Sequence, residues 1–277
     1  MTKKMQALLG IAAAGAGVVA GVVVKSTCSL IQEHIYMNMG KAKNHASGRQ
    51  LKVLHFTDVH LGMPYSFPRF KKMVKQMQSL SPDVIVCTGD LIDNPKYFAS
   101  WKKLEDLLGQ MKAPLGKYAI WGNHEKKGIN QDAVERVYAN GGFKLLCNEC
   151  KVLQLTDRQN LTIYGLDDIL KGDPDLSILP KNKKADTLAL LLLHEPDAAK
   201  IASHYGVDLI LAGHSHGGQI LFPKIGAVVR PLLSQKMLKG LYEFNGKRIY
   251  VNSGLGTTAV PFRMLCEPQY SVLHIEY

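Results

Sequence analysis

Short apolar runs recur along the chain, and a small group of polar residues follows each one. The runs at 53–56, 84–87, 118–121, 188–193 and 209–212 have the length and the polar boundaries of buried strands. The polar groups that follow them contain mainly His, Asp, Asn and Gly. The chain therefore repeats one local plan, in which a buried strand leads into polar side chains.

Segments between the first runs predict helices. Phe70, Met73, Val74 and Met77 recur at the spacing of one helix face, and lysines occupy the opposite face. A second amphipathic helix is predicted over 97–111, and a third over 131–139 that stops at two consecutive glycines. The alternation of strands with helices favours parallel strands joined by right-handed crossovers.

The second half of the chain has more strands and fewer helices. Alternating residues at 150–155 and 161–164 suggest a second sheet, and 171–186, with two prolines and four lysines, predicts a surface loop. The C-terminal third is strand-rich. The pattern predicts an α/β protein with two packed mixed sheets.

The polar groups describe one site, because ligands of an open α/β sheet bind beyond the carboxyl ends of its strands. Carboxylate and imidazole ligands suit Mn, Fe or Zn, and the lack of Cys in this set argues against a closed structural zinc. The set is too large for one tetrahedral ion, but it suits two octahedral ions that share a carboxylate. Two ions ~3.5–4 Å apart can clamp the attacking and departing oxygens of a phosphoryl displacement. The predicted ligands are Asp58, His60, Asp90, Asn123, His194, His214 and His216.

These motifs, in this order, resemble the calcineurin-like metallophosphoesterase superfamily, from about Lys52 to the C-terminus. They are Asp58-x-His60, Gly89-Asp90, Gly122-Asn123-His124-Glu125, His194 and Gly213-His214-x-His216. The resemblance implies a four-layer α/ββ/α sandwich. It also implies a phosphate-ester substrate and two divalent ions, of which we expect Mn²⁺, with Fe or Zn as alternatives.

The resemblance also implies a role for each residue. Asp58, His60 and His216 would hold one metal, Asn123, His194 and His214 the other, and Asp90 would bridge the two. His124 would act on the leaving group, and Asp93 would orient the His124 imidazole.

Differences from branches of the superfamily narrow the function. Asn94-Pro95 follows Asp93 where serine/threonine protein phosphatases have Arg-Gly, and His124 stands where the soluble pyrophosphatases of lipid A synthesis have Arg. The later Gly254-Leu255-Gly256 and Arg263 resemble the bacterial membrane-associated branch. We expect hydrolysis of a phosphodiester or pyrophosphate in a membrane-associated or nucleotide-linked substrate, such as UDP-diacylglucosamine. A broad-specificity monoesterase and a non-catalytic scaffold are the alternatives.

The N-terminal segment differs in character from the rest. Residues 5–24 contain one polar side chain, Gln6, and the run is long enough to cross a bilayer as a helix. We expect residues 1–25 to be a retained membrane anchor, with a cleaved signal peptide as the alternative. A basic linker over 26–50 and a phosphoesterase domain over 51–277 would follow. The expected location is the cell membrane, single-pass, with the catalytic domain facing the cytoplasm.

Charge and cysteine content add two expectations. Residues 1–80 carry +9 of the net charge of +11, which favours anionic lipid headgroups, although a solvated basic linker and helix explains the charge nearly as well. No aromatic interleaving or binding motif points to nucleic acid, and the oligomeric state is left open. Cys147-x-x-Cys150 lacks a second pair, so the cysteines are expected to be structural or free thiols.

Overall fold

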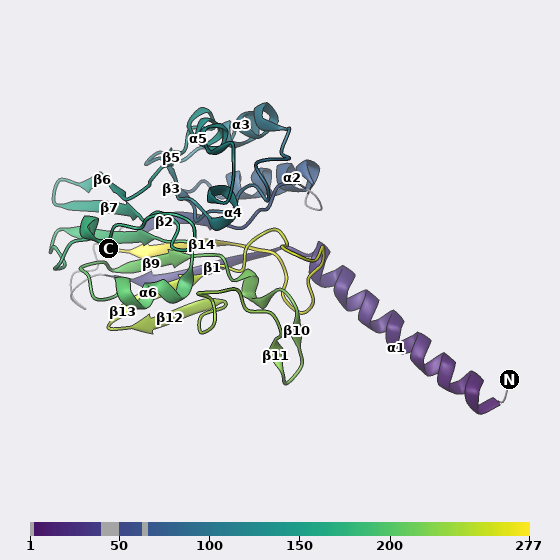
Figure 1. The fold of residues 1–277 in the computed structure, drawn as a ribbon. Coiled ribbons are helices and arrows are strands. Elements are labelled where there is room, and N and C mark those ends of the chain that lie inside the picture. Colours follow the sequence, from purple (N-terminus) through teal and green to yellow (C-terminus); the bar gives the residue numbers. More distant parts are fainter. Residues whose placement is uncertain (1–2, 40–49, 63–65) are drawn as a thin grey trace.

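The structure, a computed structural model, describes residues 3–39, 50–62 and 66–277, with side chains in the first helix from residue 16 onward. Two six-stranded mixed sheets pack face to face and carry helices on the outside, as Figure 1 shows. The longer helices are α1 (Lys3–Cys28), α2 (Phe67–Gln78), α3 (Trp101–Gly109) and α5 (Gln131–Asn140). Single helical turns occur at α4 (Asn123–Lys126), α6 (Ala199–Ala202), η1 (Leu176–Ile178), η2 (Pro196–Ala198) and η3 (His216–Gly218).

The first sheet has the strand order β1-β14-β2-β3-β4-β5. Its members are β1 (Ile31–Asn38), β14 (Gln269–Glu276), β2 (Gln50–Phe56), β3 (Val84–Cys87), β4 (Lys117–Ala119) and β5 (Lys144–Leu145). Strands β2 to β5 run parallel, whereas β14 pairs antiparallel with β2. The parallel strands bring their carboxyl ends to one edge of the sheet.

The second sheet has the order β12-β13-β9-β8-β7-β6. Its members are β12 (Gly240–Phe244), β13 (Lys247–Val251), β9 (Leu209–Ala212), β8 (Thr187–Leu192), β7 (Gln159–Gly165) and β6 (Glu149–Thr156). Strands β13, β9, β8 and β7 are parallel, and the two edge strands are antiparallel to their neighbours. A separate hairpin joins β10 (Leu221–Phe222) to β11 (Gly226–Ala227).

Alternate side chains of the central strands fill two different cores. In β8, Leu188, Leu190 and Leu192 lie between the two sheets, while the residues between them face the outer layer. In β3, Val84 and Val86 likewise lie between the sheets. Strands with both faces buried need apolar residues at every position, which is why these runs are continuous in the sequence.

The outer layers are unequal. Helices α2, α3 and α5 pack on the first sheet, and the four apolar residues predicted for the buried face of α2 lie in that core. The outer face of the second sheet is covered mainly by loops with the short α6. The two mixed sheets are confirmed, but the fourth layer is thinner than an α/ββ/α sandwich implies.

Two predicted boundaries were wrong. The helix expected over 97–111 begins at Trp101, because Asn94 accepts a hydrogen bond from the Lys96 amide and turns the chain first. Ile31–Asn38, expected within a linker, instead forms β1 and pairs with β14 over its whole length. The part of that linker at 40–49 lies outside the described residues.

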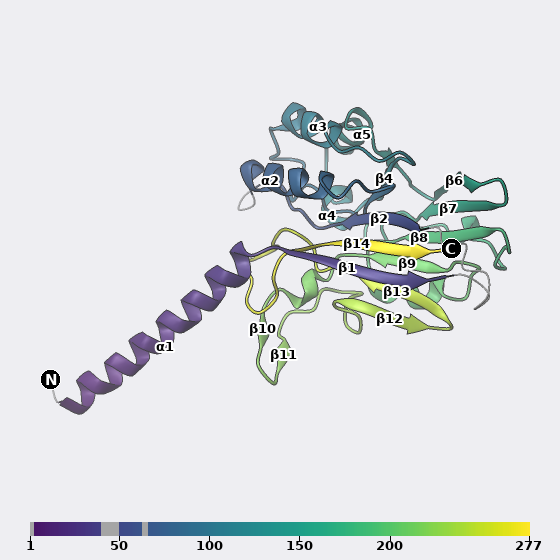
Figure 2. The same ribbon diagram turned by 180° about the vertical axis from the view of Figure 1, so that it is seen from behind.

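Helix α1 extends away from the two sheets in both views (Figures 1 and 2). Its last turn contacts the globular part, where Ser26 Oγ accepts from the Leu265 amide at 2.9 Å and Thr27 Oγ1 from the Arg263 amide at 2.9 Å. Among the described residues we find no helix with the length and apolar character that a membrane span requires. This finding contradicts the predicted anchor and the predicted single-pass location. The run is rich in Ala and Gly, and its polar last turn is held by the loop at 263–265.

Candidate metal centre

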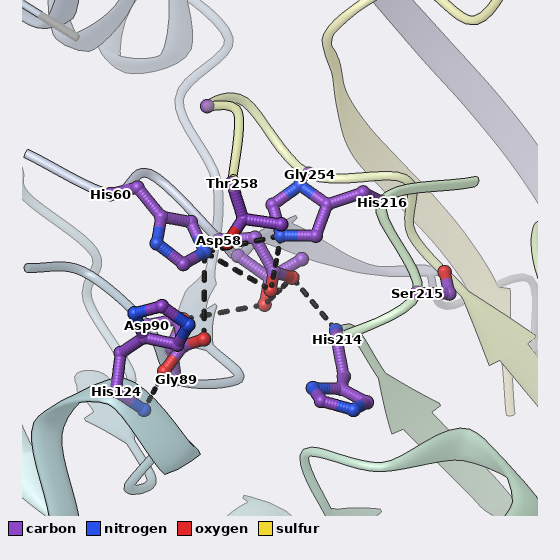
Figure 3. A network of polar contacts seen from close by, with 12 residues as sticks. Asp58, His60, Gly89, Asp90, His124, His214, Ser215, His216, Gly254 and Thr258 are labelled. Atoms are coloured by element: carbon purple, nitrogen blue, oxygen red, sulfur yellow. Dashed lines mark hydrogen bonds and ion pairs between the residues drawn. The ribbon is translucent and has the colours of Figure 1, made fainter. Parts of the chain in front are cut away.

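The predicted site residues lie where strands of both sheets end. Asp58 and His60 follow β2, Asp90 and Asp93 follow β3, Asn123 and His124 begin α4 after β4, His194 follows β8, and His214 and His216 follow β9. The two sheets therefore contribute to the same cluster, which Figure 3 shows from close by. All of the predicted residues come together, although they span more than half of the chain.

Three groups of side chains in this cluster are close enough to share an ion each. They are Asp58–His60–His216, His60–Asp90–His124 and Asp90–His194–His214, and the ligand atoms within each group lie within 4.8 Å of one another. Asp90 belongs to two of the groups. Its Oδ2 is 3.5 Å from His60 Nε2 and 3.4 Å from His194 Nε2, so one carboxylate oxygen lies between the two ends of the cluster.

The backbone at these residues is unusual. Asp58, His60, Asp90, His214 and His216 all have a positive φ, between 48° and 65°. Residues other than glycine avoid this region, and such conformations gather at functional sites where the surrounding structure holds them. Each of these turns comes directly after a strand and directs a polar side chain into the cluster.

Two glycines allow the motifs to approach one another. A Cβ on Gly89, whose φ is +94°, would lie 2.7 Å from Gly122 Cα and 2.8 Å from His194 Nδ1. A Cβ on Gly213 would collide with the side chain of Thr57 and lie 2.5 Å from Asp58 Oδ2. Packing between motifs therefore requires glycine at both positions, and at Gly89 the positive φ of the turn favours it as well.

Hydrogen bonds fix which ring nitrogen of each histidine faces the cluster. His194 Nδ1 donates to the Thr88 carbonyl at 2.6 Å, and His214 Nε2 donates to the Leu232 carbonyl at 2.9 Å. His60 Nδ1 lies 3.0 Å from Asp93 Oδ1. Each bond commits one nitrogen to a backbone or carboxylate acceptor and leaves the other for a ligand, as is common for metal-binding histidines.

His124 occupies the outer edge of the cluster. Its Nδ1 lies 2.9 Å from the Asp93 carbonyl oxygen and 3.3 Å from Asp93 Oδ1. The side chain is 25% exposed, whereas the other histidines of the cluster are nearly or fully buried. Among the described residues, none makes a hydrogen bond to Nε2, which therefore remains available to a substrate.

The electrostatics of the cluster reflect concentrated negative charge. Burial alone would raise the pKa of Asp58, but the nearby His60, His216 and His194 outweigh it and lower that pKa. Burial would lower the pKa of His60, yet Asp58 and Asp93 raise it to about 9. Burial lowers the pKa of His216, and the neighbouring His60, whose Nε2 is 3.1 Å from His216 Nε2, lowers it further. The carboxylates therefore attract positive charge to this point.

The residues present fit divalent cations. Asp58 Oδ1 is buried and has no hydrogen-bond partner, an arrangement that is costly for a carboxylate unless a positive group faces it. His60 Nε2 and His216 Nε2 point at the same place, and one of them lacks a proton to donate there. Oxygen and imidazole donors without thiolates are typical of Mn, Fe or Zn sites.

Several supporting residues were not predicted to belong to the site. Arg263 is fully buried and donates to the carbonyls of His216, Ser253, Gly254 and Gly256. It therefore joins the loop after β9 to the loop after β13. Glu125 is buried and accepts from the Leu91 amide, and burial followed by the charge of Asp90 raises its pKa to about 8. The sequence offered Arg263 only as part of a resemblance, because no local pattern shows that its guanidinium reaches the His216 carbonyl, 47 residues away along the chain.

His55 and the Cys147–Cys150 pair lie outside the predicted ligand set. His55 is buried, and its Nε2 lies 2.8 Å from Thr88 Oγ1 beneath the cluster; burial lowers its pKa to about 3, so the ring is neutral. Cys147 and Cys150 are exposed free thiols.

Comparison with known proteins agrees with this site. Residues 51–218, more than half of the chain, match the calcineurin-like phosphoesterase family. The chain is 35% identical over 225 residues to the uncharacterized metallophosphoesterase YkuE of Bacillus subtilis, covering 81% of this chain and 79% of that protein. It is 25% identical over 228 residues to the phosphodiesterase YaeI of Escherichia coli, covering 81% of this chain and 82% of that protein.

Solved structures also resemble this chain. A dimetal phosphatase from Danio rerio aligns with a TM-score of 0.45 and 12% identity, covering 74% of this chain and 87% of that one. The family and the residue clusters together suggest two divalent metal ions. The chain belongs to the calcineurin-like phosphoesterase family and is a metal-dependent phosphoesterase hydrolase.

Proposed function

We propose that the protein hydrolyses a phosphodiester or pyrophosphate bond in a nucleotide-linked substrate, of which UDP-diacylglucosamine is one candidate. The relative from Escherichia coli is named a phosphodiesterase, which supports this class of substrate. The observation that carries the proposal is the position of Asp90 Oδ2, 3.5 Å from His60 Nε2 and 3.4 Å from His194 Nε2. A carboxylate placed there can be shared by two ions.

We assign the ligands in two sets around Asp90. Asp58, His60 and His216 would hold one ion, and Asn123, His194 and His214 the other. Two divalent ions in such a site supply positive charge that stabilises the attacking and departing oxygens in phosphoryl transfer. We expect Mn²⁺ in both positions, with Fe or Zn as alternatives that the same donors accept.

His124 would act as the proton donor to the departing oxygen. Asp93 holds its Nδ1 through two contacts, which fixes the ring and directs Nε2 away from the Asp93 loop. A positioned acid of this kind must lie within hydrogen-bond reach of the leaving oxygen, and the partial exposure of His124 permits that approach. Asp93 also contacts His60, so it would orient two rings of the site together.

The test uses metal-free protein and a panel of substrates. We expect no hydrolysis without metal, and after addition of Mn²⁺ a higher kcat/KM for bis(p-nitrophenyl) phosphate than for p-nitrophenyl phosphate. UDP-diacylglucosamine belongs in the same panel. Equal hydrolysis with and without metal would contradict a metal-dependent site, and a strong preference for the monoester would support the monoesterase alternative instead.

A further inference from the structure

A cavity of about 610 Å³ opens beside His124. Its lining includes Asp93, His124, Lys96, Lys127 and Thr258. The catalytic His124 thus forms one wall, so the cavity lies on the side of the cluster where the proposed leaving group departs. Its volume suits a group much larger than a methyl or phenyl alcohol, since ligand pockets of ~300–1,000 Å³ hold whole small molecules.

The cavity is electrically distinct from its neighbour. A second cavity of about 380 Å³ also reaches Asp93, but its lining contains Phe67, Tyr97 and Phe98 and no lysine or arginine among the described residues. The cavity beside His124 has two lysines and one carboxylate, Asp93. That carboxylate contacts His60 and His124. The Lys96 ammonium lies over the Tyr97 ring, 5.2 Å from the ring centre. With two lysines against one carboxylate, the charge of the lining favours an anion.

The loops that carry the lysines are held in place before any ligand binds. Asn94 Oδ1 accepts from the Lys96 amide at 3.1 Å, which closes a turn, and Asn130 Nδ2 donates to the Pro95 carbonyl at 3.1 Å. Asn130 has a φ of 74° and follows the Lys127 loop, so this bond joins the two lysine-bearing loops. The opposite wall is also fixed, because Gln219 hydrogen-bonds to Thr258 on both its amide and carbonyl groups.

We propose that this cavity binds a leaving group that itself carries a phosphate, and that Lys96 and Lys127 select it. The inference rests on the proposed function and deepens it: the preferred substrate is a pyrophosphate diester and not a simple phosphodiester. Water attacks one phosphorus, the bond from that phosphorus to the bridging oxygen breaks, and the electron pair leaves on the second phosphate. His124 gives a proton to the departing oxygen; one proton of the water restores His124, and the other stays on the attacked phosphate or passes to the buffer. Lysine binds phosphate as a point charge, which suits the second phosphate, a monoanion in the intact substrate that gains a further negative charge as it leaves.

Two substrates that differ in the leaving group test the inference. ADP-ribose releases a phosphorylated sugar, whereas thymidine 5′-monophosphate p-nitrophenyl ester releases nitrophenolate. In Mn²⁺-loaded protein we expect Lys96→Gln and Lys127→Gln each to lower the ratio of kcat/KM, ADP-ribose over the ester, by about tenfold, and the double variant by more. The exposed Lys181→Gln is the matched control and leaves the ratio unchanged.

A binding measurement separates this inference from the proposed function. Calorimetry with α,β-methylene-ADP, which resists hydrolysis at the bridging position, reports the affinity of the loaded protein directly. We expect the double lysine variant to bind at least tenfold more weakly than wild type, with Lys181→Gln unchanged. If wild type hydrolyses neither substrate, the proposed function fails while this affinity still decides the role of the lysines. An unchanged ratio, or an unchanged affinity in the double variant, overturns the inference.

Discussion

Asp90 connects the two halves of the metal centre more directly than any other side chain described. Its Oδ1 accepts from the His124 amide at 2.9 Å, and its Oδ2 lies between His60 and His194. The residue is therefore held by the backbone on one oxygen and left with the other for cations. An asparagine at this position would keep the size of the side chain but lose the negative charge that would balance the positive charge of both ions.

Asp90→Asn should bind fewer ions than wild type. We expect about two Mn²⁺ per wild-type chain by elemental analysis, and loss of one with weakened binding of the other in the variant, because a shared carboxylate balances charge on both. Asp106→Asn, which removes an exposed acid paired with Lys102, is the control and keeps full occupancy. Full occupancy in Asp90→Asn would contradict the bridging role.

His124→Ala should keep both metals and lose rate. The loss depends on the leaving group, since general-acid catalysis contributes ~10²–10⁴-fold and a poor leaving group needs it most. We expect a large fall in kcat for alkyl phosphodiesters and a much smaller one for nitrophenyl esters. Steady-state kinetics on the two ester series measure this difference. An equal loss for both would show that His124 binds the phosphate and does not donate a proton.

At the scale of secondary-structure elements, the sequence predicted some helices and strands and missed others, for physical reasons. The face of α2 was found because buried positions recur with the helical period. The strands before the ligands were found because both faces are buried and the residues are continuously apolar. Strand β1 was missed because five of its eight residues are polar or aromatic. Alternate residues along the strand are exposed, as expected for an edge strand.

The candidate ligands could be predicted because each follows a strand, and parallel strands end together. The contact of Arg263 with the His216 carbonyl and that of Asn252 with the His55 carbonyl could not be predicted, because each joins segments remote in sequence. The turn at Asn94 could in principle have been found from its Asn-Pro pair, a common turn signal. This turn determines where α3 begins, and it forms part of one wall of the cavity beside His124.

The hydrogen bonds by which Arg263 holds the loops beside the site can be tested by mutation. Arg263→Met keeps much of the volume but leaves the carbonyls of Ser253, Gly254 and Gly256 without their buried donor. Each buried unpaired group costs about 1–3 kcal/mol, and the contributions are not additive, so we expect a loss of about 3 kcal/mol or more in the free energy of unfolding. Urea denaturation measures the change.

The control for that variant is Arg158→Met, at an exposed position in the turn between β6 and β7. We expect its stability to stay within about 0.5 kcal/mol of wild type. A small effect of Arg263→Met, similar to that of the control, would mean that water replaces the guanidinium and that the loops hold without it.

At the scale of the whole molecule, one site depends on both sheets and on the end of α1. Thr27 Oγ1 accepts from the Arg263 amide, and Arg263 in turn holds the loops beside His216. The contact between the end of α1 and the loop at 263–265 could not be predicted from the apolar run, because that run predicts a helix but not what the helix packs against.

Lys117 makes the stability of the whole fold depend on pH. The residue is only 9% exposed, and its ammonium group donates to the carbonyls of Leu108 and Gly141. Burial, with a smaller contribution from Lys112, lowers its pKa to about 8. Above that pH the folded chain has lost this proton while the unfolded chain, with an ordinary pKa of ~10.4, still holds it. Unfolding then binds a proton, so the contribution of Lys117 to stability rises with pH between about 8 and 10.4.

Lys117→Met removes that dependence. We expect the free energy of unfolding of wild type, minus that of the variant, to increase from pH 8 to pH 10 by at most about 1.4 kcal/mol per pH unit, and to be flat from pH 6 to 7.5. Taking the difference cancels the titration of other groups, including the buried tyrosines. Urea denaturation at each pH measures it, and the exposed Lys181→Met should give no slope. A flat difference for Lys117→Met up to pH 10 would show that its two carbonyl acceptors keep the ammonium charged in spite of its burial.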